Sequence, residues 1–547
     1  MAYYKLNAYD ADVFLNSFNG LSRTSTEIND DIRYADEEKN VETPNGVLQP
    51  KAEDEILRGD FNDARIETLA RFHRRWYKGA DKDWLVACVS GHLYYRQVGH
   101  DVEWEEVDLP SGVDAYQSSV WSWVTYEETP QNSTVTIDVL LLSNKKDGMI
   151  MISPPDRPKN WEDTVEKTWG KVKDNSYGTA DPSDIQTWKM TKSASWTIQT
   201  VDTQGYKFGV ICRYAERIWG GDVDGQPDLL VYSRPYNPKD WTGPGQDEEP
   251  EDCAGEIRQP SWDGASFTAL RIFGDQLLAF KNNRVWRVMG VHPGEYSMKE
   301  QYGGGAPYPA TVVVDTERVY MAETEGLSVY DGMSVAPYMR SSVEKIWRRI
   351  NRSAMDQMCA AMFQKRLYFA FPVDGSTVNN ALLVYNQMEG TILFYDNIYI
   401  EALLATDDCL FATSSSVPGK LLCMNYDSWV LGKASGKATR WVTPWMDFSR
   451  KDIVKGGFEV YFTPEVQEEP VTLTFSVQTE KKLKTKSYTI QPLTDEQKEA
   501  EKKHKGKRLH FGGSGRRFRL IIESAEGVTA PWRLVGGIMM IVETDPD

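Results

Sequence analysis

A loose internal repeat runs through the middle of this 547-residue chain. In each copy, a strand ending in an aliphatic-aromatic pair is followed, after a turn, by a second strand that ends in an aromatic residue and Asp or Asn. The clearest copies are 318–321 with 327–332, and 366–369 with 383–386. One such hairpin cannot bury its apolar face alone, so it must stack on a similar unit. The repeat therefore predicts a toroid of small sheets, a β-propeller.

Weaker copies extend the repeat in both directions. The marker positions 219, 278, 320, 368 and 411 are separated by 59, 42, 48 and 43 residues, close to the roughly 40–50 residues of one four-stranded blade. With the hydrophobic hairpin at 139–152, we predict about seven blades, irregularly spaced. The weaker copies are Ile218-Trp219 with Val231-Tyr232, Leu277-Leu278 with Val285-Trp286, Leu410-Phe411 with Asn425-Tyr426-Asp427, and Leu93-Tyr94.

The repeat assigns residues 65–435 to the propeller, with inserted loops at 157–200 and 244–258. A short helix is predicted at 341–350, because Val343, Ile346, Trp347 and Ile350 share one face after a Ser cap candidate. We expect this helix to pack on a blade.

Residues outside the repeat form two further regions. Residues 1–64 are polar and turn-rich, which predicts either an extended arm, on its own protomer or a neighbour, or a lead-in strand that closes the propeller. Residues 436–547 have a different alternation that predicts a C-terminal β-sandwich. Its five expected strands are 441–445, 457–462, 471–477, 517–522 and 537–542.

Charge is unevenly distributed. The net charge of −18 argues against a surface that neutralises phosphates, although an acidic wall would let DNA pass without sticking. Residues 244–257 hold six acidic residues and no basic one, either as a solvated loop or as an interaction site. Residues 481–519 hold 13 Lys or Arg against 4 acidic residues and include a helix-forming run at 495–505. This basic hairpin or linker is either solvated or contacts an acidic partner or DNA.

Cysteine usage and hydropathy indicate the compartment of synthesis. The six Cys residues are scattered, without a C-x-x-C pair or a signal peptide, so we expect buried reduced thiols. No stretch approaches the roughly 18 apolar residues of a membrane span. Synthesis in a cytoplasm is the expectation.

The sequence contains no recognisable catalytic constellation. It has six His, no H-E-x-x-H and no Cys/His cluster at metal spacing. The glycine-rich segments 432–437 and 512–515 are expected to be turns. We therefore predict no enzyme activity, no cofactor, and no catalytic or metal-binding residue. The turn with Asp222, Asp224 and Asp228 is interpreted as an Asp-Gly turn, with a divalent cation as the alternative.

Several segments in the second half resemble tailed-bacteriophage structural propellers. The segments are Arg217-Ile218-Trp219-Gly220 through Leu230-Val231-Tyr232-Ser233 to Asn237-Pro238-Lys239-Asp240-Trp241, then 283–290, 303–306, 318–332 and 343–350, and finally 516–519 with 532–537. Their order is similar to that in phage tail hub and tail nozzle proteins, which stabilise packaged DNA. The resemblance implies a virion protein, assembled in the host bacterial cytoplasm. It also implies a homo-oligomeric ring of six copies below the portal or adaptor, lining the path of DNA ejection.

Two other functions fit parts of the sequence. The 18 Trp residues suit a propeller at the tail tip that binds host glycans. More remotely, residues 237–243 faintly resemble an aspartate-box turn of a propeller glycosidase, but the Ser-x-Asp-x-Gly order is missing. Because fold does not determine function, these alternatives stay open beside the structural one.

Overall fold

The computed structural model describes residues 10–21, 33–74, 82–99, 102–128, 137–154, 196–246, 248–258, 264–448, 453–494, 497 and 506–544. Most of the predicted loop 157–200, Asp247 of the acidic segment, and all of the run 495–505 except Gln497 lie outside these residues.

The described residues form seven four-stranded antiparallel sheets of the kind that make up propeller blades. The sequence prediction of an all-β propeller with about seven blades is therefore confirmed. In six sheets the four strands follow one another along the chain, whereas the seventh takes its last strand from the N-terminal region. The first three sheets are β6 (Thr68–Arg74), β7 (Lys82–Val89), β8 (His92–Gln97), β9 (Glu105–Glu106); β10 (Ser122–Glu128), β11 (Ile137–Asn144), β12 (Gly148–Ser153), β13 (Thr197–Val201); and β14 (Phe208–Tyr214), β15 (Arg217–Val223), β16 (Leu229–Tyr232), β17 (Gly255–Arg258). The next two are β18 (Ala269–Phe273), β19 (Gln276–Phe280), β20 (Val285–Met289), β21 (Ser297–Gln301); and β22 (Val313–Val314), β23 (Val319–Glu323), β24 (Gly326–Tyr330), β25 (Val335–Tyr338). The last two are β26 (Cys359–Phe363), β27 (Arg366–Phe371), β28 (Ala381–Asn386), β29 (Thr391–Asp396); and β30 (Ala402–Ala405), β31 (Leu410–Thr413), β32 (Leu421–Cys423), β5 (Glu55–Ile56).

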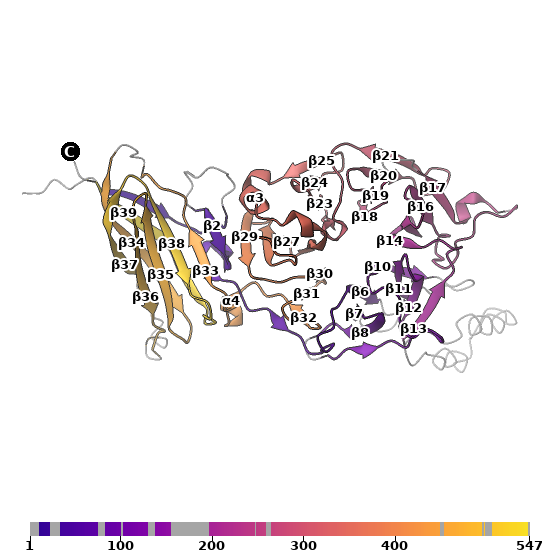
Figure 1. Ribbon diagram of the computed structural model, residues 1–547, viewed down its shortest axis with the longest axis horizontal. Coiled ribbons are helices and arrows are strands. Elements are labelled where there is room, and N and C mark those ends of the chain that lie inside the picture. Colours follow the sequence, from indigo (N-terminus) through magenta and orange to yellow (C-terminus); the bar gives the residue numbers. More distant parts are fainter. Residues whose placement is uncertain are drawn as a thin grey trace, which may run out of the picture. The chain divides into compact units, whose positions relative to one another are not determined.

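The chain divides into two compact units. One comprises residues 57–338 and 413–421, and the other comprises 1–56, 339–412 and 422–547. The first unit contains the five sheets from β6 to β25, which follow one another along an arc in Figure 1.

Successive sheets of this first unit share hydrophobic cores. Trp219 on β15, for example, lies in one cluster with Leu277 and Trp286 of the following sheet. Phe208 on β14 lies in another cluster with Leu141 of the preceding sheet. The middle strands are therefore buried on both faces, which explains their nearly continuous apolar sequences.

The repeat markers fall on the second and third strands of the sheets. Ile218-Trp219 and Val231-Tyr232 lie on β15 and β16, and the other central copies follow the same rule. Two copies differ from the prediction. Leu93-Tyr94 lies on a third strand, β8, and Asn425-Tyr426-Asp427 lies beyond the end of β32. In the latter copy the strand itself is Leu421–Cys423.

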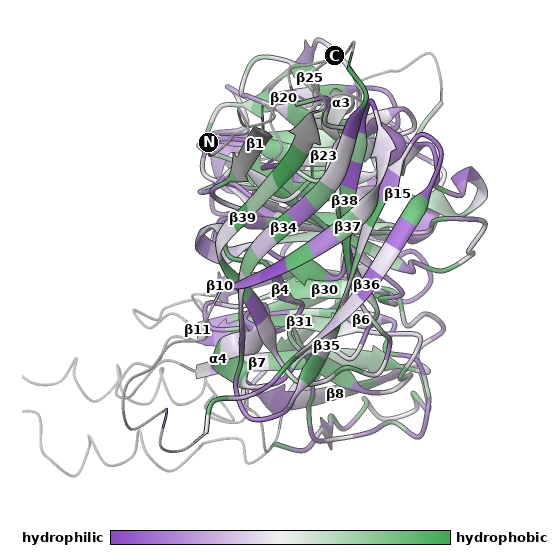
Figure 2. Cartoon of the chain, turned by 90° about the vertical axis from the view of Figure 1, so that its left-hand side faces the viewer, coloured by the Kyte–Doolittle hydropathy of each residue, from purple (hydrophilic) through white to green (hydrophobic). Residues whose placement is uncertain are grey.

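The second unit contains a sandwich of two sheets, in the orders β1-β39-β34-β37 and β2-β33-β38-β35-β36. Figure 2 looks onto the sheet that contains β39, β34 and β37. Side chains of both sheets meet in one core, where Phe462 stacks on Phe475 at 4.4 Å between ring centroids. The strands are β1 (Asp10–Leu15), β2 (Glu37–Lys39), β33 (Thr439–Val442), β34 (Lys455–Val466), β35 (Val471–Thr479), β36 (Leu483–Ile490), β37 (Lys507–Gly515), β38 (Phe518–Ser524) and β39 (Trp532–Thr544).

The basic segment 481–519 differs from its prediction as a hairpin or linker. Both β36 and β37 lie in it, so the sandwich has more strands than the five expected. The glycine run 512–515 lies inside β37 instead of forming a turn. β36 escaped notice because seven of its eight residues are not buried, so its sequence shows no apolar alternation.

The N-terminal region completes three sheets of the second unit. β1 pairs with β39, β2 pairs with β33, and β5 pairs with β32 in the seventh blade. A further hairpin is formed by β3 (Val41–Glu42) and β4 (Gln49–Pro50). The described residues of this region thus pack on their own chain, and β5 supplies the outer strand of a blade. The propeller strands begin at residue 55 instead of 65.

The helices are short. α3 (Arg340–Trp347) begins one residue before the predicted helix 341–350 and ends three residues before the predicted end. Its N-cap residue is Met339, whose side chain makes no capping hydrogen bond. Its apolar face is buried as predicted, and Trp347 contacts Phe369 of β27 at 6.2 Å between centroids. None of the helices among the described residues is long and apolar enough to cross a membrane. The others are η1 (Pro44–Gly46), η2 (Pro250–Asp252), η3 (Pro309–Thr311), η4 (Arg352–Gln357) and α4 (Ser428–Leu431).

The expectation that all six cysteines are reduced is wrong. A disulfide joins Cys409 and Cys423 across the seventh blade, where the fold brings together two residues 14 positions apart. The other four cysteines are free thiols. Burial raises the pKa of Cys212 and of Cys359 to about 12, so these two thiols are protonated at neutral pH.

Candidate functional site

A cavity of about 350 Å³ opens beside the first blade. One side is the segment that leads into β6, and the other sides are the β7–β8 turn, β8 itself and the residues before β9. The lining residues are Gly59, Asp60, Phe61, Asn62, Ala64, Val89, Ser90, His92, Tyr94, Glu103 and Trp104.

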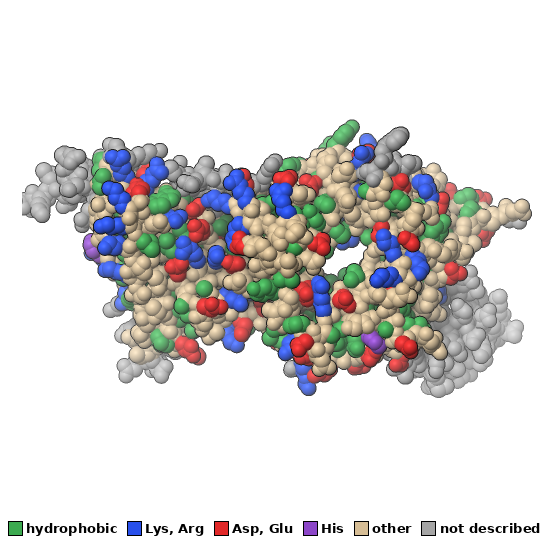
Figure 3. Space-filling view, viewed as in Figure 1, with side chains coloured by type: hydrophobic (Ala, Val, Ile, Leu, Met, Phe, Trp, Pro, Cys, Tyr) green, Lys and Arg blue, Asp and Glu red, His purple; other side chains and the backbone are tan. Residues whose placement is uncertain are grey.

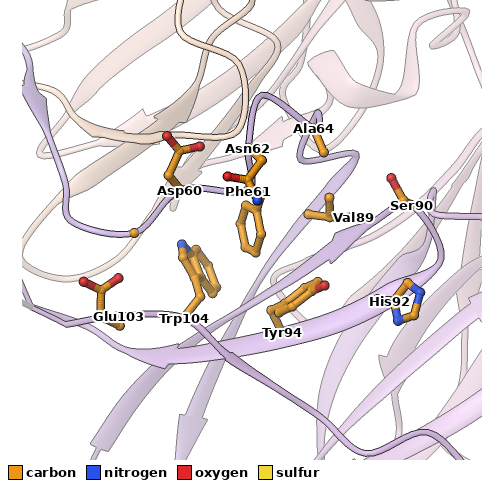
Figure 4. A pocket seen from close by; sticks show the side chains of 11 residues that line it. Asp60, Phe61, Asn62, Ala64, Val89, Ser90, His92, Tyr94, Glu103 and Trp104 are labelled. Carbon is orange, nitrogen blue, oxygen red and sulfur yellow. The ribbon is translucent and has the colours of Figure 1, made fainter.

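Three aromatic side chains that line this cavity lie close together, and we call them the aromatic wall: Phe61, Tyr94 and Trp104 (Figure 4). The ring of Phe61 lies 4.7 Å from that of Tyr94 and 5.4 Å from that of Trp104. Phe61 thus bridges Tyr94 on β8 and Trp104, which lies ten positions later, just before β9. The Phe61 ring is tilted by 57° to the Tyr94 ring and by 43° to the Trp104 ring, so the three rings pack against one another at an angle.

Backbone conformation fixes the aromatic wall. Asn62 and Asp63 both have left-handed conformations, with φ of 51° and 64°, which Asn and Asp tolerate better than most residues. The amide of Phe61 donates to Gly419 O at 3.2 Å. Gly59 has φ +102°, and a Cβ there would lie 2.7 Å from Trp104 Cδ1. The close approach of backbone and indole therefore requires glycine at this position.

Charged groups around the cavity are already paired. Arg58 Nε lies 2.5 Å from Glu103 Oε1, and Lys420 Nζ lies 3.6 Å from Asp60 Oδ2. The guanidinium of the buried Arg96 lies 5.5 Å from the centre of the Trp104 ring and donates to two backbone carbonyls. The carboxylates therefore face cations of the protein itself, although their oxygens keep further acceptor capacity.

Two polar side chains complete the lining at the opposite end, Ser90 and His92 (Figure 4). His92 Nδ1 lies 2.8 Å from Glu106 Oε1, which places a proton on Nδ1 as the donor to this carboxylate. Burial, together with the charge of Glu106, raises the pKa of Tyr94, so its hydroxyl remains a donor at neutral pH.

The sequence did not single out any of these lining residues except Tyr94, which it used only as a repeat marker. Phe61 lies in the region expected to be an arm, and Trp104 lies in a short connection. Phe61 and Trp104 come together only because β8 pairs with β7 and β9, and the local sequence gives no signal for this pairing.

The acidic turn considered for a cation is tied to two lysines. Asp222 Oδ2 lies 2.9 Å from Lys145 Nζ, and Asp228 Oδ1 lies 2.6 Å from the fully buried Lys281 Nζ. Asp224 lies in the Asp-Gly turn, closed by a bridge between Val223 and Gln226. Within the described part of the chain, there is no cluster of three or more His, Cys, Asp or Glu that could hold a metal ion.

The acidic segment 244–257, which contains η2 and most of β17, is held by the buried Arg217. Arg217 is 1% exposed and donates to Ser233 O at 2.8 Å and Cys253 O at 2.6 Å, and also to Glu251 O. Glu249 and Glu251 remain exposed on the loop surface. The segment that faintly resembles an aspartate box is a compact turn, in which Trp241 is buried against Phe208 at 5.0 Å.

Lysine and arginine side chains line one edge of the sandwich (Figure 3). We call seven exposed basic residues on β36, β37 and their adjacent turns the basic strip: Lys481, Lys482, Lys484, Lys486, Lys507, Arg516 and Arg517. Arg508 on β37 is exposed as well but is paired with Glu459, so it is not counted in the strip. No ion pair between these seven and a described acidic residue is present. Lysine on an exposed edge strand discourages indiscriminate strand pairing, so the strip both protects an edge and offers positive charge.

A buried acidic pair lies in the N-terminal region. Burial, reinforced by the charge of Glu42, raises the pKa of Glu38 well above its usual value. Burial also raises the pKa of Glu42 to about 8, against the opposing effect of Lys51 and Arg366. Glu42 is therefore predominantly protonated at neutral pH. Neither residue was identified from the sequence.

No family model matches the chain, and no curated protein does. Among solved structures, the WD40 domain of Neurospora crassa Pan2 is similar over 67% of this chain and 91% of that chain, with 8% identity and a TM-score of 0.33. This likeness is too distant to support an argument, so the class of this protein, a β-propeller joined to a β-sandwich, rests on its own sheets.

Proposed function

We propose that this chain is a structural protein of a bacteriophage tail. In this proposal, several copies, six by the sequence resemblance, form a ring in the tail hub or nozzle below the portal or adaptor. The ring provides part of the wall along which DNA is retained and then leaves the particle. The protein is assembled in the cytoplasm of the host bacterium and remains in the virion.

The observation that carries the proposal is that the N-terminal region supplies edge strands to sheets formed by the C-terminal part of the chain. β1, β2 and β5 each complete a sheet whose other strands come from after residue 400. A strand added from a distant part of the chain covers an edge that would otherwise be open and prevents the sheet from unravelling at a terminus. A protein whose sheet edges are covered in this way suits a component that bears mechanical load.

The segments that resemble phage tail propellers serve the architecture of the chain. Arg217 holds the acidic segment, Trp219 is fully buried, and Trp241 packs on a neighbouring strand. A resemblance carried by such residues supports a common scaffold more than a common ligand.

The charge supports passage of DNA without tight binding. With a net charge of −18, most of the surface repels phosphates, whereas the basic strip is confined to the sandwich. We therefore assign the basic strip to contact with an acidic surface of an adjoining tail protein. The alternative partner, DNA, predicts an affinity that falls steeply with salt concentration.

The test is the assembly state together with the location of the protein. Mass photometry and negative-stain microscopy of the purified protein are expected to show a ring, and mass spectrometry of purified virions is expected to detect the chain. Genes for a portal and a terminase are expected close to its own. A protein that stays monomeric at all concentrations and is absent from virions would refute the proposal.

A further inference from the structure

β36 is an edge strand with an open side. It ends the sheet β2-β33-β38-β35-β36 and, among the described residues, pairs with β35 alone. Six of its eight residues are exposed. The N–H and C=O groups on the outer side of an edge strand are free to pair with another chain. β36 therefore offers a template to which one more strand can be added.

The paired side of β36 holds the strand in place. Hydroxyl groups on one face of the sheet form hydrogen bonds across to β35, between Thr472 and Thr489 at 2.8 Å and between Ser476 and Thr485 at 2.8 Å. β36 thus needs little further ordering when a partner strand arrives, and such preorganisation favours binding.

Lysine side chains make this edge selective. Lys484 lies opposite Val477, and Lys486 lies opposite Phe475. Residues directly opposite each other share one face of a sheet, and Val477 and Phe475 belong to the sandwich core. The two lysines therefore lie on the core face of β36, yet both are exposed because the strand is at the edge. A neutral strand added to β36 would cover two cations without a counter-charge, which disfavours indiscriminate pairing.

The second sheet adds a third cation. β37, the edge strand of that sheet, lies beside β36 (Figure 1). Lys507 on β37 lies 5.8 Å from the centre of the Tyr488 ring, and Lys486 lies 5.8 Å from the centre of the Phe511 ring. Among the described residues, no carboxylate forms an ion pair with Lys484, Lys486 or Lys507. The three ammonium groups are therefore available to the carboxylates of a partner.

Two other anionic partners fit this edge less well. DNA carries phosphates, but its backbone has no N–H groups to pair with the open side of β36, and the net charge of −18 repels it. A second copy of this chain would offer the acidic segment 244–257. That segment is not extended, because its glutamates flank the 3-10 helix η2, and Pro250 has no N–H to donate.

We propose that β36 accepts an extended acidic segment of a different protein as an additional strand of its sheet. Because Lys484 and Lys486 are two residues apart on one face, the segment carries carboxylates at alternate positions. Its backbone pairs with the open side of β36, and its carboxylates neutralise the lysines. The inference specifies how the basic strip contacts its partner, and it rests on the proposed function only in taking that partner to be an adjoining tail protein.

The experiment measures the binding of labelled peptides to the full-length protein by fluorescence anisotropy. The main probe is as long as β36, eight residues, with Glu alternating with Thr and Val. One comparison peptide has the same composition with its glutamates consecutive, and another has Gln in place of each Glu. We expect the alternating peptide to bind at least about tenfold more tightly than either comparison. Hydrogen exchange of residues 483–490 should slow when it binds, because open backbone groups become paired.

Three results would overturn the proposal. The first is no binding of the alternating peptide. The second is equal binding of the alternating and consecutive peptides, which would show that charge alone is recognised. The third is tighter binding of single-stranded DNA with the same number of charges, which would make the edge a nucleic-acid surface. The peptide results do not depend on whether the protein forms a ring or occurs in virions, so this proposal and the proposed function fail separately.

Variants locate the binding on β36. Lys486→Glu is expected to weaken binding of the alternating peptide about tenfold, and Lys486→Arg, which keeps the charge, should retain it. Lys299→Glu is the matched control, because Lys299 is an exposed lysine on β21, the edge strand of another sheet. Melting temperatures verify that each variant is folded. Binding that survives Lys486→Glu, or that falls equally in Lys299→Glu, would exclude β36 as the site.

Discussion

Tyr395 donates a hydrogen bond of 3.0 Å to Glu42 Oε1, which joins the last strand of the sixth blade to the β3 strand of the N-terminal region. Both residues are buried. The bond lies in an apolar setting, where it contributes more than it would in water and where loss of either partner leaves a buried polar group unsatisfied.

Glu42 makes stability depend on pH. Burial raises the folded-state pKa of Glu42 to about 8, whereas an unfolded chain has a Glu pKa of about 4.3. The folded protein therefore holds a proton that the unfolded chain releases. The resulting stabilisation is fully present below pH 4.3 and is lost as pH rises through 8. Thermal melting is expected to show that Glu42→Gln, which stays neutral, lessens the decline in melting temperature between pH 5 and pH 9.

The control variant for Glu42→Gln is Glu468→Gln, which replaces an exposed glutamate on a turn of the sandwich. This variant is expected to keep the wild-type dependence of melting temperature on pH. A Glu42→Gln variant with the same slope as wild type would contradict the assignment of a buried, protonated Glu42.

Phe18 anchors the N-terminal region in the sandwich core. It is fully buried and meets Trp441 edge-on at 5.0 Å. Phe18→Ala is expected to lower the free energy of unfolding by about 3–5 kcal/mol, because it leaves a cavity in a packed core. Urea unfolding followed by tryptophan fluorescence measures this loss. Met388→Ala, at a side chain 82% exposed, is the matched variant, for which we expect almost no change.

Arg217 is expected to hold the acidic segment. Replacement by Leu leaves three backbone carbonyls without their donor, at about 1–3 kcal/mol each. Arg217→Leu should therefore destabilise the protein and increase cleavage by a Glu-specific protease at Glu249 and Glu251. Arg348→Leu, at a side chain 77% exposed, should leave the cleavage rate as in wild type. Equal cleavage of all three proteins would show that the loop does not depend on Arg217.

The disulfide between Cys409 and Cys423 can be counted chemically. In denaturant without reductant, four thiols are expected to react with a maleimide, and six after reduction. A bridge that closes a loop of this size contributes about 3 kcal/mol, so reduction should lower the urea midpoint. The variant Cys409→Ser should make that midpoint insensitive to reductant. Six reactive thiols before reduction would contradict the bridge.

The sequence predicted the middle strands of the blades because their burial leaves a strong apolar signal. Val139 to Leu142 on β11, for example, are all fully buried. The outer strands are different. β9 consists of two exposed glutamates, and β17 alternates intermediate and exposed positions. Such strands form because a neighbouring strand offers hydrogen bonds, and that information does not lie in their own residues.

The lack of a local apolar signal also explains why β5 and β36 were not predicted. β5 and β36 have little apolar character, and the partner of β5 lies more than 360 residues further along the chain. The cavity beside the first blade could not be predicted, because Phe61, Tyr94 and Trp104 carry no spacing pattern and meet only through the geometry of one blade.

The pairing of β5 with β32 and of β1 with β39 also determines when the chain can complete its fold during translation. The ribosome makes β5 early, but its partner emerges only after residue 421, and the partner of β1 only after residue 532. Until then, the beginning of the chain has no place to dock and exposes surface that favours aggregation. Products truncated before residue 532 should therefore depend on chaperones, and folding should finish only after β39 has been made.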